Sequence, residues 1–215
     1  MKLILHNYFR SSSSIRVRVA MNLKGLDYEY VAYALREKEN ESPAYLQKNP
    51  QGMVPALELE DGVVLTQSLA IMEWLEEKYP KPPLLPADAI GRARVRALSY
   101  AVACEIHPLN NLRVLQYLGE KFGADENAVA AWFRYWVAMT FAPLEKMLAH
   151  HRDTGRFCHG DTPGFADACL YAQVLNNQRF AVDMTPYPVI QRIYAACDAH
   201  EAFKQAAPMV QPDAV

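Results

Sequence analysis

The feature that most constrains the fold of this chain is a proline-rich segment that divides it in two. Residues 80–86 read PKPPLLP, with four prolines among seven residues. Neither a helix nor a central strand continues through such a segment, because proline has no backbone N–H to donate. A chain of 215 residues is long enough for two modest domains. We therefore expect a first domain at residues 1–80, a linker at 81–86 and a second domain at 87–215.

Before the linker, strand patterns and helix patterns alternate. Alternating apolar residues at 2–8 predict a strand, the run from Arg16 to Gly25 predicts an amphipathic helix, and an aromatic and β-branched stretch at 28–35 predicts a second strand. Two strands joined by a helix have to pair in parallel. The chain is therefore expected to open with a β-α-β unit.

The rest of the first domain predicts a hairpin between two helices. The segment SPAYLQKNPQGMVPALELEDGVVLTQS predicts a short helix, a proline-containing loop and two strands. Strands at 56–60 and 63–66 flank an Asp-Gly dipeptide, which is typical of hairpin turns. Ser68 can cap the next helix, which Pro80 ends. The resulting order, β-α-β-α-β-β-α, is that of a small α/β domain.

Beyond the linker the sequence changes to long segments without strand alternation. They are rich in Ala, Leu, Val and aromatic residues and run over 89–117, 125–151 and 167–180. Prolines should kink or separate them at positions 108, 143, 163, 186 and 188. We expect an all-α second domain of about five or six helices.

Composition and charge exclude several classes of function. The net charge is −2, the pI is about 6.3 and no basic cluster stands out, which argues against nucleic-acid binding. No stretch approaches the roughly 18 apolar residues of a membrane span, and the first apolar run is too short for a signal peptide. We expect a cytoplasmic protein that acts on a small molecule.

The cysteines are spaced too widely for a disulfide scaffold or a zinc site. No C-x-x-C pair occurs, so no metal is expected. Each thiol is instead expected to be a small buried side chain. The four residues are Cys104, Cys158, Cys169 and Cys197.

Serines cluster at the turn between the first strand and the first helix, where Arg10 is followed by Ser11, Ser12, Ser13 and Ser14. A helix N-terminus gathers free backbone N–H groups and the positive end of the helix dipole, and anions bind at such places. The same serines are equally suited to capping the helix. Both interpretations stay open at this point.

Two further dipeptides carry groups suited to a peptide ligand. A cis proline at Val54-Pro55 would leave the backbone of Val54 to pair with a peptide as another strand does, and a trans proline that starts a strand is the alternative. Gln67-Ser68 combines an amide, a hydroxyl and a helix N-terminus. That combination suits the carboxylate of an amino acid, or simply caps the helix.

These motifs lie in segments through which the chain resembles the zeta class of glutathione transferases. Five segments occur in the family's order across both domains, namely FRSSSSIRVRVAMNLKG, NPQGMVPAL, LTQSLAIMEWLEEKYP, IHPLNNLRVL and RFAVDMTPYP. The resemblance implies a thioredoxin-like α/β first domain, an all-helical second domain, and a homodimer with one glutathione site per subunit between the domains. It also implies glutathione-dependent cis-trans isomerisation of a maleyl keto acid, maleylacetoacetate or maleylpyruvate, to the fumaryl isomer.

The resemblance assigns a glutathione site residue by residue. Ser11, Ser12 and Ser13 correspond to the catalytic motif at the sulfur, and the backbone and γ-glutamyl end of glutathione fall to Val54, Gln67 and Ser68. The residues that complete the pocket are Asn40, His107, Asn110 and Asn111. Many zeta enzymes carry a cysteine where this chain has Ser13, so the sulfur has to come from glutathione.

The resemblance also assigns three arginines to the substrate. Arg10, Arg113 and Arg179 correspond to positions that hold the carboxylates of a dianionic keto acid, and a guanidinium suits this role because it donates two parallel hydrogen bonds. Other arginines are expected to be solvated surface residues, namely Arg18, Arg92, Arg94 and Arg96.

Three other functions are weighed against isomerisation. A glutathione transferase that conjugates haloacids or other small electrophiles would use the same fold, and so would a non-catalytic binding protein. A thiol-disulfide oxidoreductase needs a nucleophilic cysteine at the first helix, and residues 9–16 contain none.

Overall fold

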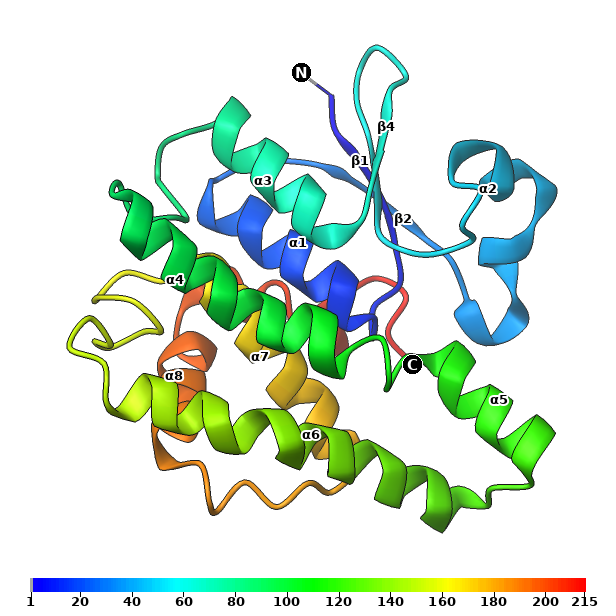
Figure 1. Ribbon diagram of the computed structural model, residues 1–215. Helices are drawn as coiled ribbons and strands as arrows, with labels where there is room; N and C mark the ends of the chain where they lie inside the picture. Colours follow the sequence, from blue (N-terminus) through cyan, green and yellow to red (C-terminus); the bar gives the residue numbers. More distant parts are fainter. Residues whose placement is uncertain (1) are drawn as a thin grey trace. The chain divides into compact units, whose positions relative to one another are not determined.

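The computed structural model describes residues 2–215 and contains two compact units. The first unit comprises Met1–Leu84 and Ala199–Val215, and the second, called the helical unit below, comprises Leu85–Asp198. The sequence predicts that residues 199–215 belong to the helical domain, but they group with the first unit (Figure 1, red). The reason is that Arg18 and Asn22 of the first helix donate hydrogen bonds to main-chain oxygens of this C-terminal segment.

The first unit is built on a four-stranded sheet with the order β2-β1-β3-β4. β1 and β2 are parallel, which confirms the predicted β-α-β unit, whereas β3 is antiparallel to both β1 and β4. Gly62 has a φ of 83° in the hairpin turn between β3 and β4, a conformation that glycine adopts without strain. The strands are β1 (Ile4–Asn7), β2 (Glu29–Ala32), β3 (Ala56–Glu58) and β4 (Val64–Thr66).

Helices α1 (Ser12–Leu23) and α3 (Ser68–Lys78) pack against each other in this unit. Their apolar faces are buried, with Val17, Met21 and Ile71 fully inaccessible. The shorter helices are α2 (Pro43–Lys48) and α9 (Glu201–Lys204), together with the single 3-10 turns η1 (Leu35–Glu37), η2 (Glu39–Glu41) and η4 (Pro208–Val210). The α/β architecture expected of the first domain is thereby confirmed.

The helical unit contains five α-helices within residues 85–198, in agreement with the sequence. The segment predicted as helical over 89–117 is interrupted around Pro108, after a π-helical stretch. Pro143, by contrast, lies inside a continuous helix. The elements are α4 (Ala89–Tyr100), η3 (Ala101–Ile106), α5 (Leu112–Phe122), α6 (Glu126–Ala149), α7 (Phe165–Arg179) and α8 (Pro188–Asp198).

Several side chains differ from their expected exposure. Cys104 is exposed, whereas the other three cysteines are buried as expected. Arg18 was expected at the surface but is fully buried, because its guanidinium binds carbonyl oxygens inside the first unit. No helix within residues 2–215 is both long and apolar enough to cross a membrane.

A buried ion pair holds the start of the linker against the first unit. The Lys24 ammonium donates to Glu76 Oε2 at 2.8 Å and to the carbonyl oxygens of Tyr79 and Pro82 at 2.6 and 3.0 Å. The same carboxylate accepts the N–H of Leu84 at 2.9 Å. Both side chains are nearly inaccessible, at 0% and 6% exposure, so removing one partner leaves a buried charge uncompensated.

We expect Lys24→Met to lower the free energy of unfolding by about 3–5 kcal/mol. The matched control is Lys2→Met, because Lys2 pairs with Glu29 at the same 2.8 Å but at 65% and 49% exposure. Loss of such an exposed pair costs less than about 1 kcal/mol. Urea denaturation of both variants provides the measurement, and equal losses would contradict this account of the linker.

Candidate functional site

The register of the sheet brings three turns of the first unit to one end. In the β1-β3 pair, His6 lies opposite Ala56, and in the β3-β4 pair Ala56 lies opposite Thr66. Because both pairs are antiparallel, the chain leaving β1, the chain entering β3 and the chain leaving β4 all lie at this end. These three stretches carry the serine turn, Val54 and Gln67-Ser68.

In the first of these stretches, the serine turn, Ser11 is the N-cap residue of α1. Its N–H bonds to the carbonyl of Tyr8 at 3.0 Å, and its Oγ accepts the N–H of Ser14 at 3.2 Å. Ser12 is buried and Ser13 is half-buried at the first turn of α1. A hydroxyl that accepts one hydrogen bond still has its own hydrogen to donate. The capping interpretation is confirmed for Ser11, and anion binding by its hydroxyl hydrogen stays a prediction.

The second stretch presents the backbone of Val54. The Val54-Pro55 peptide bond is cis, as the cis alternative requires. Among the hydrogen bonds described for residues 2–215, none uses the main-chain N–H or C=O of Val54, which is half-buried. A donor and an acceptor on one residue suit an extended peptide that pairs as an additional strand.

Polar side chains fix the loop that leads to Val54. The carbonyl of Met53 accepts the Tyr45 hydroxyl at 2.6 Å and Asn49 Nδ2 at 2.7 Å. Asn40 Nδ2 donates to the carbonyl of Gly52 at 2.7 Å, while its Oδ1 is buried with no partner among the described residues. Asn40, assigned to the cofactor by resemblance, therefore shapes the loop that leads to the Val54 backbone.

The third stretch carries a strained residue. Gln67 has a φ of 68° and a ψ of 113°, which non-glycine residues rarely adopt and which is common at ligand sites. Its side chain donates to Gln51 Oε1 at 2.9 Å. Ser68 does not cap α3, contrary to the sequence prediction, because it is the first helical residue. Its hydroxyl accepts a long hydrogen bond of 3.4 Å from Arg16.

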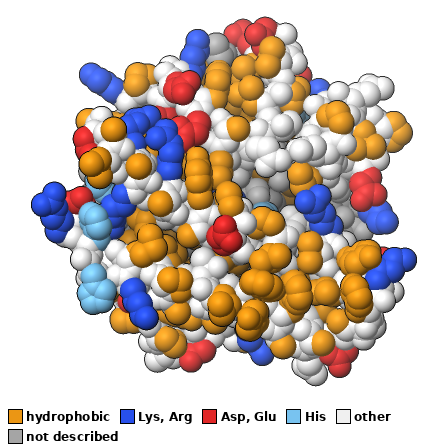
Figure 2. All heavy atoms as spheres, in the orientation of Figure 1, with side chains coloured by type: hydrophobic (Ala, Val, Ile, Leu, Met, Phe, Trp, Pro, Cys, Tyr) orange, Lys and Arg blue, Asp and Glu red, His pale blue; other side chains and the backbone are white. Residues whose placement is uncertain are grey.

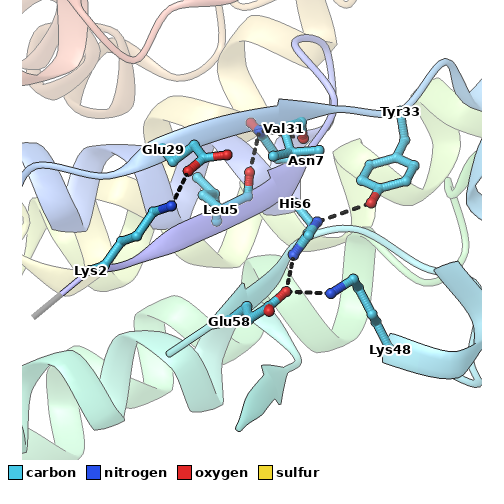
Figure 3. Close-up of polar contacts among 9 residues, drawn as sticks. All are labelled: Lys2, Leu5, His6, Asn7, Glu29, Val31, Tyr33, Lys48 and Glu58. Atoms are coloured by element: carbon cyan, nitrogen blue, oxygen red, sulfur yellow. Dashed lines mark hydrogen bonds and ion pairs between the residues drawn. The ribbon is translucent and has the colours of Figure 1, made fainter. Parts of the chain in front are cut away.

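A chain of polar contacts joins β1 and β3 to α2 (Figure 3). His6 lies between the Tyr33 hydroxyl, 3.0 Å from Nδ1, and Glu58 Oε2, 2.9 Å from Nε2. Lys48, the last residue of α2, donates to the same Glu58 oxygen at 2.6 Å. The hydrogen bond from Lys48, followed by that from His6, lowers the pKa of Glu58, while burial raises the pKa of Tyr33. The carboxylate thus stays ionised and joins α2 to β3.

In the helical unit, the break between η3 and α5 gathers four of the assigned residues. Asn111 caps α5 by accepting the N–H of Arg113 at 3.2 Å, and its Nδ2 lies 3.4 Å from His107 Nε2. Asn110 is buried and donates to the carbonyl of Phe133 at 3.1 Å. The Arg113 side chain is exposed. Asn110 thus anchors this break to α6.

The other two assigned arginines lie elsewhere in their units. Arg179, at the end of α7, is exposed and donates to Asn176 Oδ1 at 3.2 Å. The neighbouring Phe180 ring stacks on Phe133 at a centroid distance of 3.8 Å. In the first unit, Arg10 is half-exposed and donates to the main-chain oxygen of Val215 at 2.9 Å.

Sequence reasoning missed two arginines of the first unit. Arg16 and Arg18 are buried, at 1% and 0% exposure, and contact Ser68 and the turn after β1 respectively. The available signal was their position between apolar residues, in the stretch from Ile15 to Met21. A guanidinium is buried among apolar side chains only where polar groups are available to bind it.

Known proteins resemble this chain in sequence and structure. Residues 10–78 match the glutathione S-transferase N-terminal domain family. A maleylpyruvate isomerase of a Ralstonia species is 52% identical over 97% of this chain and 98% of its own length. The holo structure of a zeta-class bacterial maleylpyruvate isomerase superposes with a TM-score of 0.96 at 51% identity, with full coverage of both chains.

A second solved structure carries ligands. It is a maleylacetoacetate isomerase from Methylobacterium extorquens AM1 with bound malonate and glutathione. It superposes with a TM-score of 0.95 at 40% identity and covers 99% of both chains. With half of its residues identical to an enzyme of this group over nearly its whole length, the chain belongs to the zeta class of the glutathione transferase family.

Proposed function

We propose that this protein catalyses the glutathione-dependent cis-trans isomerisation of a maleyl keto acid, maleylacetoacetate or maleylpyruvate, to its fumaryl isomer. The observation that carries the proposal is the unpaired main chain of Val54 at the sheet end where α1 begins. That arrangement fits a peptide thiol whose backbone pairs with Val54 and whose sulfur reaches the serine turn. The similar proteins named above are isomerases of this kind.

When bound, glutathione supplies a thiolate that adds reversibly to the substrate alkene, so that rotation about a carbon-carbon single bond becomes possible. Ser11 orients the thiolate with its hydroxyl hydrogen, since its Oγ already accepts the N–H of Ser14. Ser12 and Ser13 present their backbone N–H groups at the first turn of α1. Gln67 and Ser68 receive the γ-glutamyl carboxylate at the N-terminus of α3.

The first experiment asks whether glutathione is a cofactor or a substrate. Isomerisation should require glutathione, while the concentration of free thiol stays constant as the fumaryl product forms. Conjugation of an uncharged aryl halide is the control, because there the thiol is consumed. A stoichiometric loss of thiol with the maleyl acid would contradict isomerisation and favour the transferase alternative.

The substrate carboxylates are proposed to bind three arginines. Arg113 and Arg179 are exposed and Arg10 is half-exposed, so each can reach a ligand. A maleyl keto acid has two acidic ends, and each needs its own anchor. A planar guanidinium binds a carboxylate through two hydrogen bonds, which a lysine ammonium cannot reproduce.

Arg179→Lys should therefore lower kcat/KM for the maleyl acid about tenfold, although the charge is kept. Arg152→Lys is the control, since the Arg152 side chain is 93% exposed and has no assigned role. Steady-state kinetics with saturating glutathione provide the measurement. Unchanged kcat/KM in separate alanine variants of all three assigned arginines would remove them from the substrate site.

The helical unit also has a surface suited to a second copy of the chain. Figure 2 shows hydrophobic side chains gathered over this unit in the region of α5 and α6. A hollow of about 350 Å³ between η3 and α6 is lined mainly by apolar residues, among them Trp136, Met139 and Met147. Exposed apolar patches of this kind are typical of protein interfaces. We assign this surface to the interface of a homodimer. We also propose that the protein is cytoplasmic, because glutathione is kept there as a thiol.

Met139→Glu combined with Met147→Glu should convert the dimer to a monomer, because buried carboxylates without partners oppose association. The control is Met209→Glu, since Met209 is 68% exposed in the first unit, compared with 56% and 46% for the two test positions. Light scattering coupled to size-exclusion chromatography measures the mass. A double variant with the wild-type dimer mass would contradict this interface.

A further inference from the structure

The C-terminal segment holds the turn that precedes α1. The Asp213 carboxylate accepts two hydrogen bonds in the first unit. Its Oδ2 accepts the backbone N–H of Phe9 at 3.0 Å, and its Oδ1 accepts the Tyr30 hydroxyl at 2.5 Å. Phe9 is only 1% exposed, so this N–H has little access to water. Burial, followed by the hydrogen bond to Asp213, raises the pKa of Tyr30, so its hydroxyl stays protonated and donates.

Arg18 also binds this turn. Its guanidinium donates to Asn7 Oδ1 and to the carbonyl of Phe9, both at 2.8 Å. Its Nε and Nη2 both donate to the carbonyl of Ala206 in the C-terminal segment, at 3.1 and 2.9 Å. The amide side of Phe9 is therefore fixed by Asp213 and its carbonyl side by Arg18.

The turn that contains Phe9 sets the position of Ser11. Ser11 follows Phe9 by two residues, and its N–H bonds back to the carbonyl of Tyr8. A rotation of the Phe9 peptide would move the Ser11 hydroxyl and the first N–H groups of α1 together. Hydrogen-bond strength depends steeply on distance and angle, so small movements matter at a sulfur.

We propose that Asp213 is a positioning residue, whose carboxylate fixes the turn from Tyr8 to Ser11 and thereby aims Ser11 and the N-terminus of α1 at the glutathione sulfur. This inference rests on the proposed function. Asp213 does not touch the reacting atoms, and it acts through the Phe9 N–H and Tyr30. Asp213 lies 204 residues from Phe9 in sequence, so only the fold connects them.

The test compares Asp213→Ala with Asp213→Asn. Asparagine can keep both hydrogen bonds, because its oxygen accepts the Phe9 N–H and its amide donates to the Tyr30 oxygen. Alanine keeps neither. Ultraviolet titration of bound glutathione should show that Asp213→Ala raises the thiol pKa by about one unit. Below the pKa, this shift makes the thiolate fraction about tenfold smaller. The variant should lower kcat by a larger factor than it changes the KM for glutathione. Asp213→Asn should behave as the wild type.

Two controls separate positioning from stability. Asp198→Ala removes a similar contact, because Asp198 Oδ1 accepts the Tyr171 hydroxyl at 3.2 Å within the helical unit, and it should leave the thiol pKa unchanged. Ser11→Ala should raise the thiol pKa and so proves that the readout responds. If Asp213→Ala does not fold, Tyr30→Phe takes its place, with a smaller rise expected.

The outcomes distinguish this inference from the proposed function. An unchanged thiol pKa in Asp213→Ala or its substitute, alongside a raised pKa in Ser11→Ala, would overturn the positioning role and leave the function intact. An Asp213→Asn variant as impaired as Asp213→Ala would also overturn it, since the hydrogen bonds would then not be the cause. Failure of the wild type to bind glutathione as a thiolate would instead overturn the proposed function.

Discussion

The candidate site depends on the antiparallel pairing of β3 with both of its neighbours. That pairing is the reason that the serine turn, Val54 and Gln67-Ser68 lie at one end of the sheet. Because successive side chains point to opposite faces, a slip of one residue in either pair would move every side chain of β3 to the other face of the sheet. The buried Ala56 and Leu57 hold this register through the packing of the core.

Two buried cationic side chains bind segments of the first unit that lie outside the sheet. Arg18 joins the turn after β1 to the C-terminal segment, and Lys24 joins the end of α1 to α3 and the linker. Each binds several carbonyl oxygens, so one charge satisfies acceptors that would otherwise be buried and unpaired. Lys24 also pairs with Glu76. In the turn after β1, Asp213 binds Phe9, together with Tyr30. The cations thus position chain segments as well as satisfy acceptors.

The sequence predicted the elements of the fold better than it predicted their long-range contacts. The β-α-β opening, the hairpin and the helical character of the second part follow from local periodicity and turn residues, and all are present. Residues 199–215 were assigned to the wrong unit because their placement depends on contacts with Arg18, which lies far away in sequence. Similarly, serine is a common helix-capping residue, but α3 already begins at Ser68, because Gln67 with its unusual φ takes the capping position. Periodicity and turn composition carry no information on either point.

The proposed activation of the glutathione thiol by the serine turn needs no cysteine at position 13. A helix N-terminus stabilises a nearby anion by about 0.3–1 kcal/mol, and a hydrogen bond to a charged group contributes about 1.5–3 kcal/mol. Since one pKa unit corresponds to about 1.4 kcal/mol, these two effects together lower a thiol pKa of about 8.5 by roughly 1.3 to 3 units. That range brings a substantial fraction of thiolate to neutral pH with Ser11 and the first turn of α1 alone. A second thiol at position 13 would stabilise a thiolate less than serine does, because a thiol is a weaker hydrogen-bond donor than the hydroxyl that stands there.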